Sequence, residues 1–91
     1  MNKWQEQYIN YWYDGKKPRG KRAKMHLELL GKIKEYVQVT FSDGRTEEYK
    51  VVLENSNMPK GIISCVDLVG NLELWLSRGH KITTTNQSTV K

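Results

Sequence analysis

A tight β-hairpin near the middle of the chain is the feature that most limits how these 91 residues can fold. Two runs of alternating apolar and polar residues flank Ser42-Asp43-Gly44, a sequence typical of a short turn. A two-residue loop would set apolar side chains opposite polar ones. A three-residue loop pairs Phe41 with Arg45 and Val37 with Tyr49, which keeps the apolar faces together. We therefore expect the three-residue loop, with Gly44 in the left-handed conformation. The two apolar faces are Ile33, Val37, Val39 and Phe41 on one strand and Tyr49, Val51 and Leu53 on the next.

Residues 3–13 predict a helix that ends at Asp14-Gly15, where Gly15 is suited to the left-handed cap conformation. Four aromatic residues recur at helical spacing and form one stripe, namely Trp4, Tyr8, Tyr11 and Trp12. So short a helix is not stable alone, so the stripe must pack on the rest of the protein. We interpret Trp4 and Tyr8 as core residues. The last three aromatics, Tyr11, Trp12 and Tyr13, are candidates for stacking on nucleic-acid bases.

The segment from Ser64 to Arg78 reads best as a second helix. Its apolar residues fall on one helical arc, namely Cys65, Leu68, Val69, Leu72, Trp75 and Leu76. Ser64 followed by Asp67 resembles a capping box, and Gly79 is placed to end the helix. On this interpretation Leu74 faces solvent.

A hairpin is the alternative for the same segment. Gly70 is unfavourable in the middle of a helix, and Gly70-Asn71 would suit a turn. Leu72, Leu74 and Leu76 would then alternate along a strand. In that case the protein would be a small all-β barrel with an N-terminal helix.

The remaining segments complete an α+β fold. Met25, Leu27 and Leu29 alternate with His26 and Glu28, which predicts a strand over 25–29 with His26 facing solvent. Residues 55–61 are expected to connect two elements, residues 80–85 to form a last strand, and residues 86–91 to be a frayed tail. The expected order is α-β-β-β-α-β in one domain, residues 1–91. A small antiparallel sheet carries the N-terminal helix and has the second helix packed on one face.

The order of the first five expected elements is similar to that of double-stranded-RNA-binding domains. That family carries a basic cluster at the start of its second helix, whereas this chain has Ser64, Cys65 and Asp67 there. The resemblance is therefore one of shape, and it assigns no family.

A basic run from Lys16 to Lys24 carries the excess charge of the chain. The whole chain has 15 basic and 10 acidic residues, a net charge of +5. Six of the basic residues lie in this run, so the rest of the chain has nine basic and ten acidic residues, a net charge of −1. Pro18 and Gly20 predict that the run is a loop. Its cations repel one another unless an anion lies among them. The candidate phosphate-binding residues are Lys16, Lys17, Arg19, Lys21, Arg22 and Lys24.

Composition and motifs argue against several other kinds of protein. The single cysteine, Cys65, excludes an intramolecular disulfide and a cysteine zinc site, and it suits a reducing cytoplasm. No apolar run reaches the ~18–20 residues that a membrane span needs, and the N-terminus lacks the apolar stretch of a signal peptide. No nucleophile and base show a recognisable spacing. We therefore expect no catalysis, cofactor or metal.

Two functions fit these features. The first is a small nucleic-acid-binding protein, for RNA or DNA, in which the basic loop contacts phosphates. The second is a phage or accessory adaptor or inhibitor that docks on an acidic surface of a larger host complex, such as a polymerase or a defence effector. A basic loop alone does not separate them, because a polyanion and an acidic protein surface present similar fields. A third possibility is a loop that only aids solubility.

Overall fold

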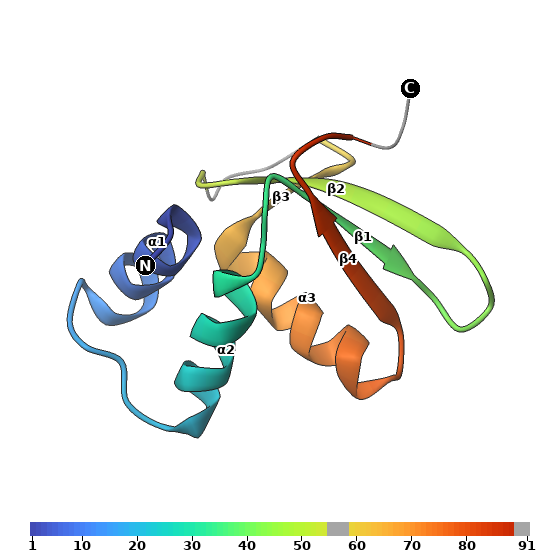
Figure 1. Ribbon diagram of the computed structural model, residues 1–91. Coiled ribbons are helices and arrows are strands. Elements are labelled where there is room, and N and C mark those ends of the chain that lie inside the picture. Colours follow the sequence, from blue (N-terminus) through green and yellow to red (C-terminus); the bar gives the residue numbers. More distant parts are fainter. Residues whose placement is uncertain (55–58, 89–91) are drawn as a thin grey trace.

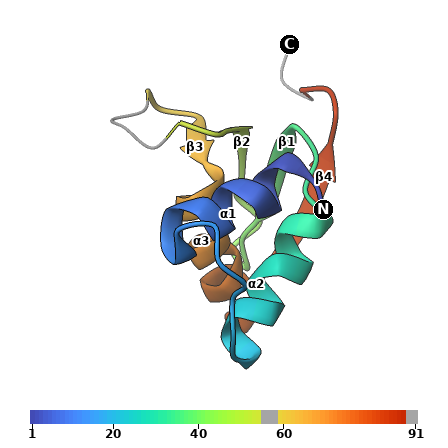
Figure 2. The same ribbon diagram turned by 90° about the vertical axis from the view of Figure 1, so that its left-hand side faces the viewer.

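The computed structural model describes residues 1–54 and 59–88, and within them the fold is α+β, as expected. Helix α3 lies against a four-stranded sheet, and α1 and α2 pack on α3 and on one another (Figures 1 and 2). The helices are α1 (Lys3–Tyr13), α2 (Lys21–Gly31) and α3 (Cys65–Ser77). The strands are β1 (Tyr36–Thr40), β2 (Thr46–Val52), β3 (Ile62–Ser64) and β4 (Lys81–Thr85).

Helix α1 has the predicted bounds, and its two ends are well defined. Asn2 and Gln5 form a reciprocal capping box, in which the Gln5 N–H donates to Asn2 Oδ1 over 2.9 Å and the Asn2 N–H donates to Gln5 Oε1 over 2.7 Å. Asp14 and Gly15 end the helix with φ values of 51° and 80°. Trp4 and Tyr8 are buried, which confirms them as core residues.

The strand predicted over 25–29 is wrong, because these residues belong to α2. The true stripe is helical: Ala23, His26 and Leu30 are the buried residues of this helix. His26 was expected to face solvent, yet it is buried and only 7% exposed. The alternation of Met25 and Leu29 with polar residues is thus coincidental. It also follows that the basic run is not all loop, since Lys21, Arg22 and Lys24 form the start of α2.

The central hairpin has the predicted register. Val37 pairs with Tyr49, and the Phe41 N–H donates to the Arg45 carbonyl over 2.8 Å. Gly44 has a φ of 89°, as the three-residue loop requires. The strand order is β3-β2-β1-β4, in which β1 is antiparallel to both of its neighbours. The sheet is nevertheless mixed and not purely antiparallel, because β3 pairs with β2 in parallel.

Helix α3 confirms the helical interpretation of residues 64–78 and rules out the barrel. Ser64 caps it by accepting a hydrogen bond from the Asp67 N–H over 3.3 Å, and Gly79 follows it with a φ of 79°. Leu74 is 44% exposed, as expected, whereas Leu72 is fully buried. The shape resemblance to double-stranded-RNA-binding domains does not hold, because the second element is a helix.

The C-terminal strand lies where it was expected, and β4 pairs with β1. The predicted connection includes residues 55–58 and the predicted tail includes 89–91, all of which lie outside the described residues. None of the helices in the described part is long and apolar enough to cross a membrane.

Replacing Gly70 by Ala should stabilise the protein by up to about 1 kcal/mol. The residue lies inside α3, and an added Cβ would meet no atom within 4 Å. Urea unfolding measures the effect. Leu74→Ala should be nearly silent as a control, whereas Leu72→Ala should cost about 2–5 kcal/mol. A lower unfolding free energy for Gly70→Ala would contradict a helical conformation with open space at residue 70.

Candidate nucleic-acid interface

Two pockets flank the loop of residues 14–20 that joins α1 to α2. The first, called here the aromatic pocket, has a volume of about 520 Å³ and lies between the end of α1, the start of α2 and the first half of α3. Its aromatic wall is Trp12 and Tyr13, with Tyr8 deeper inside. The basic residues on it are Arg19, Lys21 and Arg22, and α3 contributes Val66, Val69 and Gly70.

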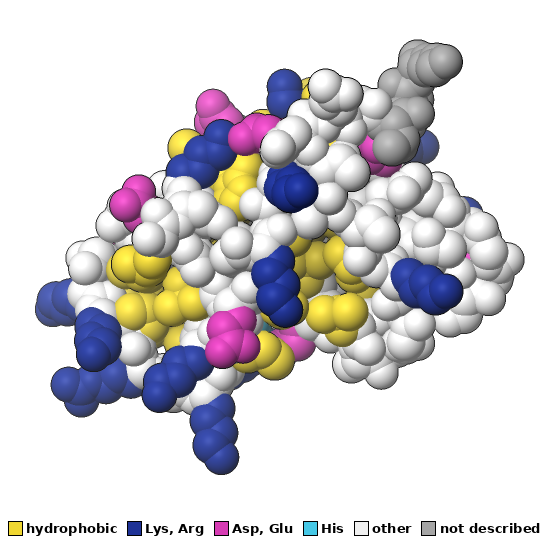
Figure 3. Space-filling model, viewed as in Figure 1, with side chains coloured by type: hydrophobic (Ala, Val, Ile, Leu, Met, Phe, Trp, Pro, Cys, Tyr) yellow, Lys and Arg dark blue, Asp and Glu magenta, His cyan; other side chains and the backbone are white. Residues whose placement is uncertain are grey.

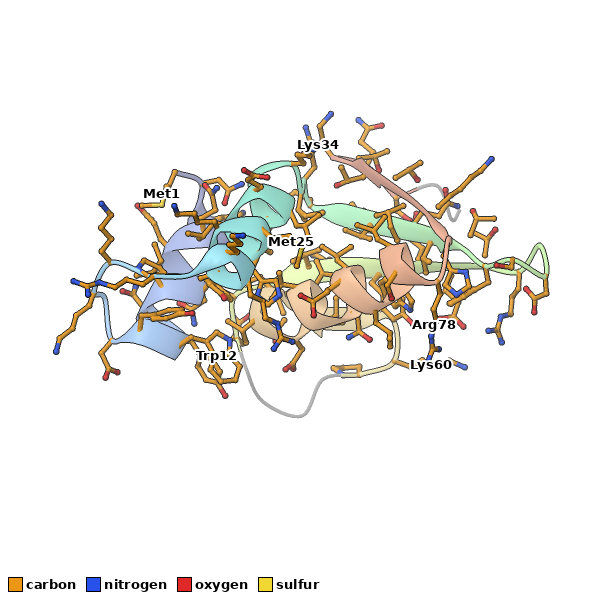
Figure 4. The ribbon with its side chains drawn as sticks, turned by 90° about the horizontal axis from the view of Figure 1, so that it is seen from below. Met1, Trp12, Met25, Lys34, Lys60 and Arg78 are labelled. Carbon is orange, nitrogen blue, oxygen red and sulfur yellow. The ribbon has the colours of Figure 1, made fainter. Side chains whose placement is uncertain are left out.

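The second pocket, called here the aliphatic pocket, has a volume of about 720 Å³. Its apolar lining is Met1, Ile9, Pro18 and Leu27, and its basic residues are Lys16, Lys17 and Lys24. Figure 4 shows Trp12 and Met1 on opposite sides of the end of the molecule that holds the loop. The two pockets share no lining residue.

The structure divides the predicted site residues into two groups. Basic side chains gather at the loop end of the molecule, as expected (Figure 3). Five of the candidates meet at the aromatic pocket, namely Trp12, Tyr13, Arg19, Lys21 and Arg22. Lys16, Lys17 and Lys24 lie at the aliphatic pocket instead. Tyr11 lines neither; it is 48% exposed and contacts Trp12 edge to face, with ring centroids 5.0 Å apart.

A chain of hydrogen bonds runs beside the aromatic pocket and joins all three helices. The Tyr8 hydroxyl lies 2.9 Å from His26 Nδ1, and His26 Nε2 lies 2.8 Å from Glu73 Oε2. Because an ionised carboxylate only accepts, Nε2 carries the proton, and a neutral imidazole then accepts at Nδ1 from Tyr8. Arg22 completes the chain by donating from Nε and Nη2 to the two oxygens of Glu73, over 3.3 and 3.0 Å.

This chain was missed at the level of sequence because it depends on α2. Arg22 and His26 are four residues apart, so a helix brings both to one side, where α3 presents Glu73. With residues 16–24 expected as a loop and 25–29 as a strand, Arg22 and His26 fell in different elements, and nothing linked the two side chains. The i, i+4 spacing of Arg22 and His26 is the signal that a helical interpretation would have used.

Two pKa shifts describe the chemistry of the chain. Burial raises the pKa of Tyr8 to about 12, so its hydroxyl stays protonated at neutral pH. The hydrogen bond from Arg22, followed by that from His26, lowers the pKa of Glu73. The network therefore holds a negative carboxylate that fixes Arg22, and it does not supply a tyrosinate nucleophile.

The start of α2 is electrostatically unfavourable by itself. Gly20, its N-cap residue, has a φ of 99° and offers no side chain to cap the helix. The first turn has no acidic residue, and Lys21 and Arg22 lie at the positive end of the helix dipole. Helices α1 and α3, in contrast, have side-chain caps. An anion in the aromatic pocket would reduce this repulsion.

Two further observations concern thiol and metal chemistry in the described part of the chain. Cys65 is buried, and its burial raises the pKa of the thiol to about 11. Within residues 1–54 and 59–88, no three His, Cys, Asp or Glu side chains cluster in a way that could hold a metal ion.

The Glu73 ion pair predicts how stability depends on pH. Because folding lowers the pKa of Glu73 from its ordinary value of 4.5, the ionised carboxylate contributes stability that is fully present above that value. This contribution is lost as the pH falls through the lower pKa of the folded state. The difference in unfolding free energy between wild type and Glu73→Gln should therefore be constant above pH 4.5 and shrink as the pH falls below that value. Urea unfolding across this range measures it, with Glu28→Gln on the exposed side of α2 as the control.

Comparison with known proteins leaves the geometry as the evidence for function. No family model, no curated protein and no solved structure matches the chain.

Proposed function

We propose that this chain is a small, non-enzymatic nucleic-acid-binding protein of the cytoplasm, and that the aromatic pocket receives an unpaired base. The observation that carries the proposal is the meeting of three basic residues with Trp12 and Tyr13 at one pocket. Cations bind the phosphate backbone, and aromatic rings stack on bases. Both kinds of contact are thus available within reach of one nucleotide.

Trp12 is the strongest single argument for an unpaired base. It is 58% exposed on a small protein whose other tryptophans, Trp4 and Trp75, are buried. Tyr13, its neighbour on the pocket wall, is half-buried against Tyr8. Base stacking on such a ring contributes roughly 1–3 kcal/mol and tolerates any sequence. Since bases inside a duplex are already stacked, the proposal favours single-stranded RNA or DNA.

The hydrogen-bond chain gives Arg22 a fixed direction. Two of its donors bind Glu73, yet its side chain is 75% exposed, so the remaining donors face solvent. Arg19 and Lys21 have no ion-pair partner among the described residues. A phosphate would therefore meet the oriented guanidinium of Arg22. It could also pair with Arg19 and Lys21 without breaking an existing ion pair.

The alternative function, an adaptor or inhibitor that docks on a larger complex, would use the same positive charge. An acidic protein surface would be attracted by the loop, but it has no need for the exposed Trp12 at the aromatic pocket. The observation that favours a protein partner lies in the aliphatic pocket, which combines an apolar lining with three lysines.

Binding to single-stranded oligonucleotides should fall steeply with salt. If Arg19, Lys21 and Arg22 each contact one phosphate, the slope of log K against log salt should be roughly −2, at about 0.7 per contact. Fluorescence anisotropy with mixed-sequence RNA and DNA measures it, and a duplex of the same length should bind more weakly. No detectable binding at low salt would reject the proposal.

Matched charge variants locate the site. Arg19→Ala/Lys21→Ala should reduce the slope by about 1.4, whereas Lys16→Ala/Lys17→Ala removes the same charge from the other pocket and should leave the slope nearly unchanged. Equal losses from both pairs would show that only net charge matters. Neither pair should change the melting temperature much, because all four residues are exposed.

Two uncharged variants test the aromatic pocket itself. Trp12→Ala should weaken binding about 5- to 150-fold through lost stacking. Gly70→Leu adds a side chain to the pocket wall, where a Cβ meets no atom within 4 Å, and should block the base while leaving every charge in place. Full oligonucleotide binding by both folded variants would contradict a base in this pocket.

A further inference from the structure

We propose that the aliphatic pocket is a second binding site, which takes a short acidic segment of a partner protein anchored by one aliphatic side chain. This inference does not rest on the nucleic-acid proposal, since it concerns the other pocket. Its basis is the combination of an apolar floor with three lysines in the lining.

The floor of the pocket suits an aliphatic side chain and does not suit a base. It consists of Met1, Ile9, Pro18 and Leu27, and none of the described residues that line it is aromatic. Met1 is 82% exposed, and its unbranched thioether can adapt to the shape of a ligand. A leucine-like anchor would therefore be removed from water against methyl and methylene groups, which is the main source of such affinity.

The rim supplies the complementary charge. Lys16, Lys17 and Lys24 are exposed, and none of them has an ion-pair partner among the described residues. Glu6 and Asn10 lie on the part of the lining that α1 contributes. Acidic residues of a bound segment would therefore pair with the lysines, whereas Glu6 would repel them.

Hydrogen bonds fix the backbone of the loop where the lysines begin. The Gly15 N–H donates to the Ile9 carbonyl over 3.2 Å, and the Lys16 N–H donates to the Tyr13 carbonyl over 2.8 Å. Gly15 has a φ of 80°, a conformation that suits glycine, and it lines the pocket itself. The turn thus holds the backbone of Gly15 and Lys16 at the pocket before a ligand arrives, which reduces the ordering cost of binding.

A peptide fits this arrangement better than a fatty acid. A fatty acid carries one carboxylate and a long chain that requires an enclosed channel, whereas this pocket presents three lysines around a floor made of four side chains. Several carboxylates spaced along a peptide would satisfy the lysines together. The combination therefore specifies acidic residues on both sides of a single aliphatic anchor.

The test uses a labelled peptide in which one Leu is flanked on both sides by Asp and Glu. Anisotropy should show saturable binding to the full chain. Replacing the Leu by Ser, or the acidic residues by Asn and Gln, should each weaken binding roughly tenfold. Equal binding of the Ser peptide would overturn the proposal, because charge alone would then account for the affinity. Binding of dodecanoate without binding of the peptide would also overturn it.

The matched charge variants serve here with opposite expectations. Lys16→Ala/Lys17→Ala should weaken peptide binding roughly tenfold, since two exposed ion pairs are lost, while Arg19→Ala/Lys21→Ala should retain it. Glu6→Gln should strengthen binding because it removes the repulsive carboxylate. Failure of this proposal is thus distinguishable from failure of the nucleic-acid proposal, which depends on the other pair and on Trp12.

Amide chemical-shift changes locate the peptide independently of affinity. The largest changes should fall at Ile9, Gly15 and Leu27, on the aliphatic pocket. Changes centred on Trp12 and Gly70 would place the peptide in the aromatic pocket and would overturn the assignment.

Discussion

The packing of α3 between the sheet and the other two helices is the constraint on which the rest of the structure depends. A chain of this length buries a smaller fraction of its surface than a larger domain does, so one element serves two interfaces. Leu68 and Leu72 are completely or almost completely buried on this helix, and so are Cys65 and Val69. Because α3 is apolar over most of its circumference, it can hold the sheet on one side and α1 and α2 on the other.

The position of Glu73 follows from that arrangement. A carboxylate on a largely apolar helix needs partners, and α2 provides Arg22 and His26 on the facing side. The Tyr8 hydroxyl extends the same polar chain to α1. One acidic side chain thus orders residues on two helices and aims the arginine of the candidate interface. The site depends on the core through this connection.

Elements with a complete local signal could be predicted from the sequence. Helix α1 has an aromatic stripe and a glycine stop, the hairpin has a register that only one loop length satisfies, and α3 has a capping serine. Helix α2 was mistaken for a strand because its buried stripe contains Ala23 and His26, which do not stand out as apolar. Strand β3 spans only Ile62–Ser64 and owes its existence to pairing with β2, which no local pattern reveals.

The candidate site was predictable in its composition but not in its arrangement. The charge of the basic run and the aromatics of α1 are evident from the chain itself. Their division between two pockets is not, because it depends on the course of the loop and on which face of α2 each residue occupies. Gly20 starts the helix, so Lys21 and Arg22 turn toward α3 while Lys16 and Lys17 remain on the loop. The loop also sends Arg19 to the aromatic pocket, and α2 sends Lys24 to the aliphatic pocket, so the course of the loop and the faces of the helix together decide which cations lie side by side.

The burial of Cys65 has a practical consequence for the kinetics of this protein. Its thiol is the only one in the chain, lies at the first residue of α3 and has no exposed surface. A thiol reagent can therefore reach it only when α3 separates from the sheet. The rate of modification then reports how often α3 opens by local unfolding. Because α3 contacts the sheet, α1 and α2, this rate monitors the whole core.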